Sequence, residues 1–302
     1  MKKKKDAKAS LYIGNEELQL VSGTRSGNHI NVESFDRVTL EPGTVINGVI
    51  TDQVQFAQAL NKLMNGQPGV VEQGVDFSVG SSQIITKTIK APHLSKEDMW
   101  DWIPGEFTEI ADENQEYIYD YRILKSYEDE DLILACAGEK SIIGNYVEIF
   151  EDMNIPVESI DVGLNCQIKI ISFLEETKDG TFIFLGLDGN NLNASIFVDG
   201  VFKIYNRVRL INERGSSQVN TEIQGVVSKL IQFNRTLENS QELETVYFYG
   251  LRTDEKELAE NIFNIFKLTP KIISDKENCI TTDRAGFALS QYLYAVGNLI
   301  RN

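Results

Sequence analysis

The order of predicted secondary structure in the first eighty residues recurs in the second half of the chain. Residues 10–79 predict a β-hairpin, a third strand, a helix that starts after Asp52 and a fourth strand, because alternating apolar residues give way to helically spaced ones. Residues 182–273 predict three strands, a long helix, a strand, a second helix and a short last strand. This repeat predicts an α/β protein with a duplicated core, in which two domains flank a cleft suited to a ligand.

The stretch between the repeats, residues 81–140, predicts a small inserted α+β subdomain. Its expected elements are a strand, an aromatic-rich helical stretch and a pair of strands, at Ser82–Lys90, Leu94–Ile110, Tyr117–Ile123 and Leu132–Ala137. The acidic run Glu128–Asp131 joins the paired strands. It is interpreted either as a solvated turn or as a patch that attracts basic residues beside a membrane helix.

These patterns divide the chain into four segments. We expect a disordered basic tip, a first domain in two pieces, the inserted subdomain and a second domain, at residues 1–9, 10–80 with 141–175, 81–140 and 176–302. The lysines at positions 2–5 are interpreted as solvated charge or as a weak attraction to an anionic membrane surface. No apolar segment follows them, so we do not expect a secretory signal.

Composition excludes several classes of function. The net charge of −16 argues against nucleic-acid binding, which depends on clustered Lys and Arg. No apolar run approaches the roughly 18–20 residues of a membrane span, so we expect a cytosolic protein. The three cysteines and two histidines are too scattered for a disulfide framework or a metal site, at Cys136, Cys166, Cys279, His29 and His93.

Four segments resemble the PilM family of type IV pilus assembly proteins, which are actin-like proteins related to the divisome protein FtsA. They are the loop Pro42–Asp52, the strand–helix–strand Leu132–Asp161, the hairpin at 182–209 with Arg207 near its end, and the terminal stretch Tyr294–Arg301. Together they span nearly the whole chain. The resemblance implies an actin-like (RNase H-like) fold with two domains around a cleft and the inserted subdomain described above.

The resemblance also implies where a nucleotide would bind. In this fold two glycine-containing hairpins hold the phosphates, an acid on each organises Mg²⁺, and glycines approach the adenosine. In the first hairpin Tyr12 stands in place of the acid and Gln19 in place of a lysine, while Gly14 is kept. The first hairpin therefore lacks both the acid and the cation of the family pattern.

The second hairpin and the adenosine turn depart from the pattern too. Gly186 stands in place of the acid and Asp188 in place of a glycine, although a register shift of two would restore Asp188 as the acid. The adenosine turn keeps Gly250, but Leu251 would obstruct a close backbone approach. We therefore expect no cofactor, no metal and no catalysis here, as in a pseudo-ATPase. The alternative is an actin-like protein that binds or hydrolyses ATP with Mg²⁺ in an unorthodox pocket.

Without a nucleotide, the resemblance implies a scaffold at the cytoplasmic face of the inner membrane, in a type IV pilus or type II secretion-like machine. Its partner would be the cytoplasmic N-terminal tail of a bitopic PilN-like protein, so that the membrane association is indirect. The tail would lie in a groove between the helix at 141–153 and the strands of the insert, with strand addition as the mode of binding.

The candidate partner contacts are four aromatic residues, Trp100, Trp102, Tyr146 and Phe150. The two tryptophans are two positions apart and cannot share one helix face. One of them is therefore expected to be exposed or at a subdomain junction, either as a partly buried residue or as an anchor for the partner. The sequence leaves the oligomeric state open, and a homo-oligomer is one state that it allows.

Overall fold

The computed structural model describes residues 7–67, 74–110, 112, 114–238 and 240–300. The first repeat forms a six-stranded sheet in the order β10-β6-β1-β2-β3-β16, which runs Val157–Val162, Val75–Val79, Lys8–Ile13, Glu17–Ser26, His29–Thr39 and Ile280–Thr281. The predicted hairpin and third strand are confirmed. Residues 1–6 of the predicted tip, and residues 69–73 of the predicted fourth strand, lie outside the described residues.

The predicted tip extends too far along the chain. β1 begins at Lys8, and the Ala9 side chain is already buried against the first core. The cause is the alternation of β1, in which Ala9, Leu11 and Ile13 point to the same side. That side is covered by two helices, α1 (Gln53–Asn65) and α4 (Lys140–Asp152). Tyr12 points the other way, towards the second domain.

The second repeat forms a five-stranded sheet in the order β13-β12-β11-β14-β15. Its strands run Val201–Arg209, Asn191–Val198, Phe182–Asp188, Thr245–Tyr249 and Thr269–Ile272. Two amphipathic helices, α6 (Ser217–Thr236) and α7 (Lys256–Phe266), cover its outer face. All of these elements agree with the sequence prediction. None of the helices in the described ranges is long and apolar enough to cross a membrane.

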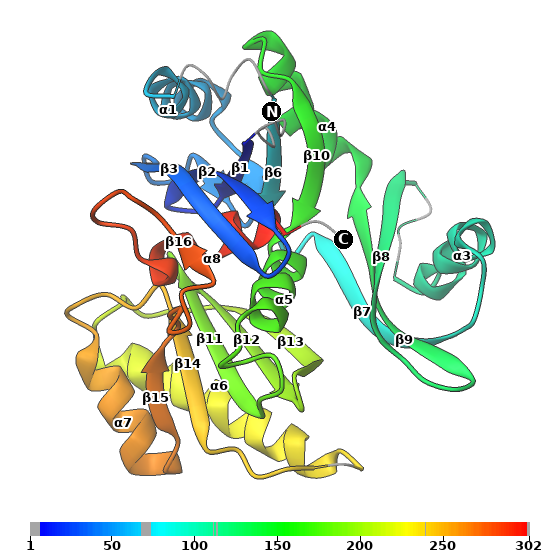
Figure 1. Cartoon of the computed structure of the whole chain (residues 1–302), viewed down its shortest axis with the longest axis vertical. Helices are drawn as coiled ribbons and strands as arrows, with labels where there is room; N and C mark the ends of the chain where they lie inside the picture. The colour runs from blue at the N-terminus through cyan, green and yellow to red at the C-terminus, as the bar shows by residue number, and fades with distance from the viewer. Residues whose placement is uncertain (1–6, 68–73, 111, 113, 239, 301–302) are drawn as a thin grey trace.

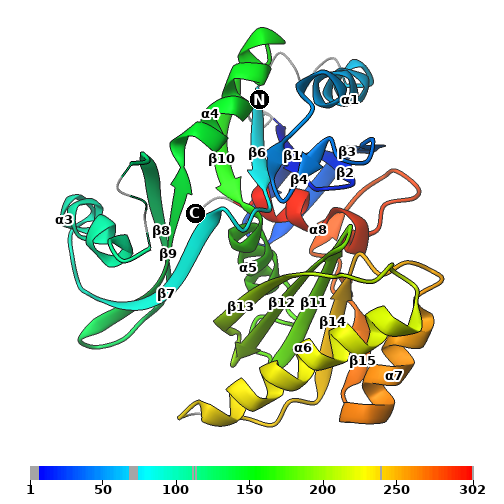
Figure 2. The ribbon, with the colours of Figure 1, turned by 180° about the vertical axis from the view of Figure 1, so that it is seen from behind.

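A layer of two helices separates the sheets (Figures 1 and 2). It consists of α5 (Gly163–Phe173) and α8 (Leu289–Asn298), and both sheets contribute to the same core around it. The two helix backbones approach so closely that a Cβ at Gly297 would lie 2.2 Å from the carbonyl oxygen of Cys166. Through α8 and β16, the last part of the chain returns to the first sheet.

The insert is a three-stranded sheet in the order β7-β9-β8, with Ile84–Pro92, Glu130–Glu139 and Tyr117–Ser126. One of its faces carries α3 (Lys96–Trp102) and the 3-10 helix η1 (Ile103–Phe107). The expected single helical stretch is thus two short helices, because Pro104 in the first turn of η1 cannot continue the α-helical hydrogen bonds. A small ribbon of β4 (Val45–Ile46) and β5 (Val49–Ile50) completes the described strands.

Two predicted features of the insert and of α4 require correction. The acidic run is only partly a turn, because Glu130 and Asp131 belong to β9 and Asp131 is buried 3.6 Å from the His93 ring. Tyr146 and Phe150 lie on the buried face of α4, and their side chains are too enclosed to contact a partner. The Phe150 ring stacks on Phe77 at 5.2 Å, and the Tyr146 hydroxyl donates to the Gly48 carbonyl at 3.1 Å.

The burial of Phe150 predicts a large stability effect. Phe150→Ala should lower the free energy of unfolding by about 3–5 kcal/mol, because it opens a cavity in the first core. The exposed Ile211, which keeps 90% of its surface in water, is the control, and Ile211→Ala should stay within about 0.5 kcal/mol. Urea unfolding followed by circular dichroism measures both. A similar small loss in the two variants would contradict this role for Phe150.

Candidate functional site

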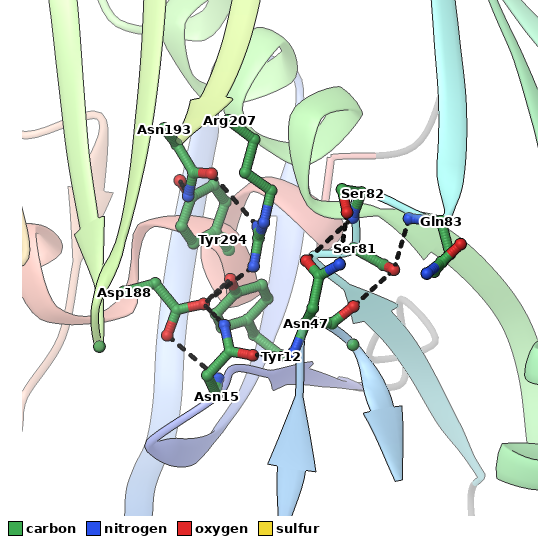
Figure 3. A network of polar contacts seen from close by, with 12 residues as sticks. Tyr12, Asn15, Asn47, Ser81, Ser82, Gln83, Asp188, Asn193, Arg207 and Tyr294 are labelled. Atoms are coloured by element: carbon green, nitrogen blue, oxygen red, sulfur yellow. Dashed lines mark hydrogen bonds and ion pairs between the residues drawn. The ribbon is translucent and has the colours of Figure 1, made fainter. Parts of the chain in front are cut away.

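The two hairpins that the repeat predicts meet at Asp188, the last residue of β11 (Figure 3). The Asp188 carboxylate accepts a hydrogen bond from the Tyr12 hydroxyl at 3.2 Å. It also accepts from the backbone N of Asn15 at 3.1 Å and from the Asn15 side-chain amide at 2.9 Å. One carboxylate of the second domain thus binds two residues of the first hairpin.

Arg207 of β13 closes this network from the other side. Its guanidinium lies 3.9 Å from the Asp188 carboxylate and is 5% exposed, and it donates to the Asn193 side-chain oxygen at 3.2 Å. The Tyr294 ring from α8 stacks on the Tyr12 ring with centroids 4.5 Å apart. Side chains of both domains therefore meet between the hairpins, as Figure 3 shows.

The electrostatics favour this arrangement. Burial, and then the neighbouring Asp188 carboxylate, raise the pKa of Tyr12 well above its ordinary value. The phenol therefore keeps its proton and can act as a donor to Asp188 at any physiological pH. The remaining charge of the carboxylate faces the Arg207 guanidinium, so the buried acid has a cation beside it.

The position of the turn in the second hairpin determines which residue of β11 faces the first hairpin. Gly189 has a positive φ of 55° and forms the turn directly after Asp188, so Asp188 and not Gly186 faces the first hairpin. Gly186 lies inside β11, where a Cβ would come within 2.9 Å of the Tyr294 hydroxyl. A Cβ at Gly14 would lie 2.9 Å from the Asp188 carboxylate. Both glycines make room for the interdomain network.

The remaining predicted positions are Gln19, Gly250 and Leu251, and each has a structural role between or within the domains. The Gln19 side-chain amide lies 2.9 Å from the Tyr249 hydroxyl of β14, which adds a second bridge between the domains. Gly250 has a positive φ of 69°, and a Cβ there would lie 2.1 Å from the Leu187 carbonyl oxygen. Leu251 packs against the core of the second domain.

A cavity of about 640 Å³ lies at this interdomain position, and its lining includes Tyr12, Gln19, Asp188, Gly250 and Leu251. The fold therefore brings the three predicted stretches together. Three arginines line the cavity, and each is paired with a carboxylate, in the pairs Arg37–Glu17, Arg214–Glu255 and Arg252–Glu16.

A triphosphate requires uncompensated cations, and Mg²⁺ requires free carboxylate oxygens. In this cavity, the Asp188 carboxylate is already bound by Tyr12, Asn15 and Arg207. In the described part of the chain, no three His, Cys, Asp or Glu side chains gather as metal ligands. A magnesium-bound nucleotide would have to compete with these partners for Asp188 and for the three arginines.

An open groove lies on the other side of the first domain, between the insert sheet and β10. Two cavities of about 150 and 760 Å³ form it, and both are lined by Asp120, Tyr121, Arg122, Ile160, Asp161 and Asn165. β10 is the edge strand of its sheet, so its outer backbone groups face the groove. Figures 1 and 2 show the insert sheet beside β10, joined to the first domain through β9 and α4.

The groove has apolar walls with charged residues among them. The smaller of its two cavities is lined by apolar side chains from the insert, from α4 and from β10, at Ile84, Ile118, Leu134, Ile143 and Ile160. Trp100 lines the larger cavity and its side chain is exposed, with 38% of the residue's surface in water, whereas Trp102 packs against the core of the insert. Of the predicted helix at 141–153, Ile143 is the residue that lines the groove.

The sequence interpretation missed the groove residues of β8. Alternate residues of that strand, Tyr117, Tyr119 and Tyr121, pack against the core of the insert. Period-two alternation then places Ile118, Asp120 and Arg122 on the opposite face. The three tyrosines at alternate positions are a signal that could have identified this face.

Two duplicated domains whose hairpins meet across a cleft define an actin-like fold. The chain is similar to the PilM–PilN type IV pilus biogenesis complex, with 16% identity, a TM-score of 0.76 and 97% of each chain covered. It is also similar to a protein of unknown function with an actin-like ATPase fold from Bacteroides thetaiotaomicron, with 12% identity, a TM-score of 0.55 and 88% of this chain and 90% of that chain covered. The predicted fold is confirmed.

A third similar structure is the cytoplasmic domain of EpsL, an inner membrane component of the type II secretion system of Vibrio cholerae. It has 7% identity and a TM-score of 0.53, and the match covers 98% of this chain and 96% of that chain. No protein-family model and no curated protein matches the sequence. These structural similarities establish the fold of the chain.

The hydrogen bond from Tyr12 to Asp188 should contribute measurably to stability. Tyr12→Phe removes the donor and keeps the ring that stacks on Tyr294, so the loss is that of a hydrogen bond to a charged group, about 1.5–3 kcal/mol. Tyr127→Phe, at a position 42% exposed in the insert, is the matched control and should stay within about 0.5 kcal/mol. Equal midpoints for the two variants in urea would refute the contribution of Tyr12.

Proposed function

We propose that this chain is a non-catalytic scaffold of a type IV pilus or type II secretion-like machine. It binds the cytoplasmic N-terminal tail of a bitopic PilN-like inner-membrane protein and is held at the inner face of the membrane through that partner. The observation that carries the proposal is the groove between the insert sheet and the edge strand β10. The similarity in fold to the PilM–PilN complex and to the cytoplasmic domain of EpsL supports it.

The groove suits an extended peptide. The outer edge of β10 presents backbone donors and acceptors along Val157–Val162, to which a peptide can add as a further strand. In an added strand, every second side chain points to the same side. Ile118 and Leu134 of the insert sheet offer apolar contacts to one such row of side chains.

The interdomain cleft supports the non-catalytic part of the proposal. Asp188 and the three arginines of the cavity already have partners within the chain. Binding of a nucleotide there would have to compete with these partners. Of the three pairs, Arg214–Glu255 is buried, with both side chains 4% exposed, and it is costly to break because a charge would be left uncompensated. In this protein, the side chains between the hairpins hold the two domains together and replace the bridging role of a nucleotide.

Calorimetric titration with Mg·ATP tests this part. We expect no heat of binding at millimolar nucleotide and no release of phosphate, because the three arginines among the described lining residues are paired with carboxylates and Asp188 is already bound. Binding in the micromolar range would instead favour the alternative, an actin-like ATPase with an unorthodox pocket.

A synthetic peptide of the cytoplasmic tail of the bitopic protein encoded beside this chain tests the partner. At a hundredfold excess over Kd it should add about 2.7 kcal/mol to the free energy of unfolding and raise Tm. Ile118→Asp should weaken binding at least tenfold, about 1.4 kcal/mol, because it places a charge in the apolar part of the groove.

Ile118 is 45% exposed, so this variant should fold. Ile211→Asp, at a more exposed apolar residue outside the groove lining, is the matched control and should bind the peptide as the wild type does. The proposal fails if the tail neither raises Tm nor co-purifies with the chain, or if both variants bind it equally.

A further inference from the structure

Two opposite charges lie on the groove face of the insert sheet. Asp120 and Arg122 are two positions apart on β8, so both side chains lie on the same face as Ile118. Each lines both cavities of the groove. They are separated by roughly 6.6–6.8 Å along the strand, and no ion pair joins them within the described ranges.

The Arg122 guanidinium lacks a complete set of partners. Its Nη1 atom is buried and has no hydrogen-bond partner among the described residues. Asp161, an acid across the groove, is already bound by the Lys169 ammonium at 2.6 Å and by the Asn165 amide at 2.9 Å. Burial lowers the pKa of Arg122, so its surroundings disfavour the charge that it carries.

The Asp120 carboxylate forms no ion pair within the described ranges, although the charges of Lys96 and Lys169 act to lower its pKa. It accepts a hydrogen bond from the backbone N of Tyr121 at 2.7 Å, and no Lys, Arg or His of the described ranges forms an ion pair with it. Desolvation, together with repulsion from Asp161, raises its pKa. The side chain is nevertheless open to solvent, so a ligand in the groove can reach it.

We propose that the groove selects a segment in which an acidic and a basic residue are two positions apart, the acid bound by Arg122 and the base by Asp120. This inference rests on the proposed function, since it names the chemistry of the tail. An extended segment beside β8 places its own residues i and i+2 on one side with the same spacing. The order of the two charges in the segment then depends on the direction in which it runs.

The cost of desolvation is the source of the selectivity. A segment in the groove removes both charges from water, and a buried charge without a partner is strongly unfavourable. A segment with the matching pair compensates both, whereas an apolar or like-charged segment leaves Asp120 or Arg122 unpaired. An anionic lipid headgroup would satisfy Arg122 alone and leave Asp120 without a cation, so the pair of charges favours a peptide.

Selection from a phage-displayed library of random twelve-residue peptides on the full chain tests the inference. We expect the enriched peptides to share one acid and one base two positions apart, in one order. The double variant Asp120→Arg with Arg122→Asp exchanges the two charges without changing the net charge. It should bind a selected peptide at least tenfold more weakly and should regain affinity for the same peptide with its two charges exchanged.

The control exchanges a charge pair elsewhere in the same sheet. Lys90→Glu with Glu130→Lys reverses a 2.5 Å ion pair that is open to solvent and is not part of the groove lining, so peptide binding should be unchanged. If the first double variant does not fold, judged by its thermal unfolding, Arg122→Gln and Asp120→Asn each remove one charge. Each single variant should bind the selected peptide more weakly than the wild type does. Its affinity should not fall further when the peptide loses the charge that faced the replaced side chain.

The outcomes separate this inference from the proposed function. Enriched peptides without the charge pair, or unchanged affinity in the exchanged variant, would overturn the inference while tail binding in the groove stands. If no peptide and no tail binds the wild-type chain, the proposed function itself fails. Loss of binding in the exchanged variant, followed by rescue with the exchanged peptide, would support both.

Discussion

One buried carboxylate, that of Asp188, joins the hairpins of the two domains. It needs a cation and donors because an uncompensated charge inside the protein is strongly unfavourable, and its partners come from the first hairpin and from β13. β13 carries Arg207 and also contacts β8 of the insert. β13 therefore contacts both sites: Arg207 reaches the interdomain network, and β8, which β13 touches, forms one wall of the groove.

Much of the fold was predictable because its local patterns are strong. Both repeats alternate with period two in their strands and then switch to helical spacing, and the buried faces of α1, α6 and α7 follow that spacing. These inferences about the fold need only neighbours in sequence. The departures at Tyr12 and Gln19 from the nucleotide-binding pattern come instead from the resemblance to a known family, and their effect on nucleotide binding remains a prediction.

The groove could not be derived in the same way, because its walls come from segments far apart in the chain. α4 carries apolar residues at helical spacing, but only its packing on β6 decides that Phe150 is buried while Ile143 lines the groove. Likewise, the alternation of β8 separates two faces without saying which face is covered. That Asp120 and Arg122 remain on the uncovered face depends on where α3 and β10 pack.

The return of the chain to the first sheet has a consequence for how the protein is made. One face of that sheet is covered by α8, and β16 completes its edge, yet both elements lie beyond residue 279. The ribosome must therefore synthesise the sheet of the second domain and residues beyond 279 before the first domain can bury that face. The first domain should remain a client of chaperones during synthesis, and folding should be slow, since these contacts join distant parts of the sequence.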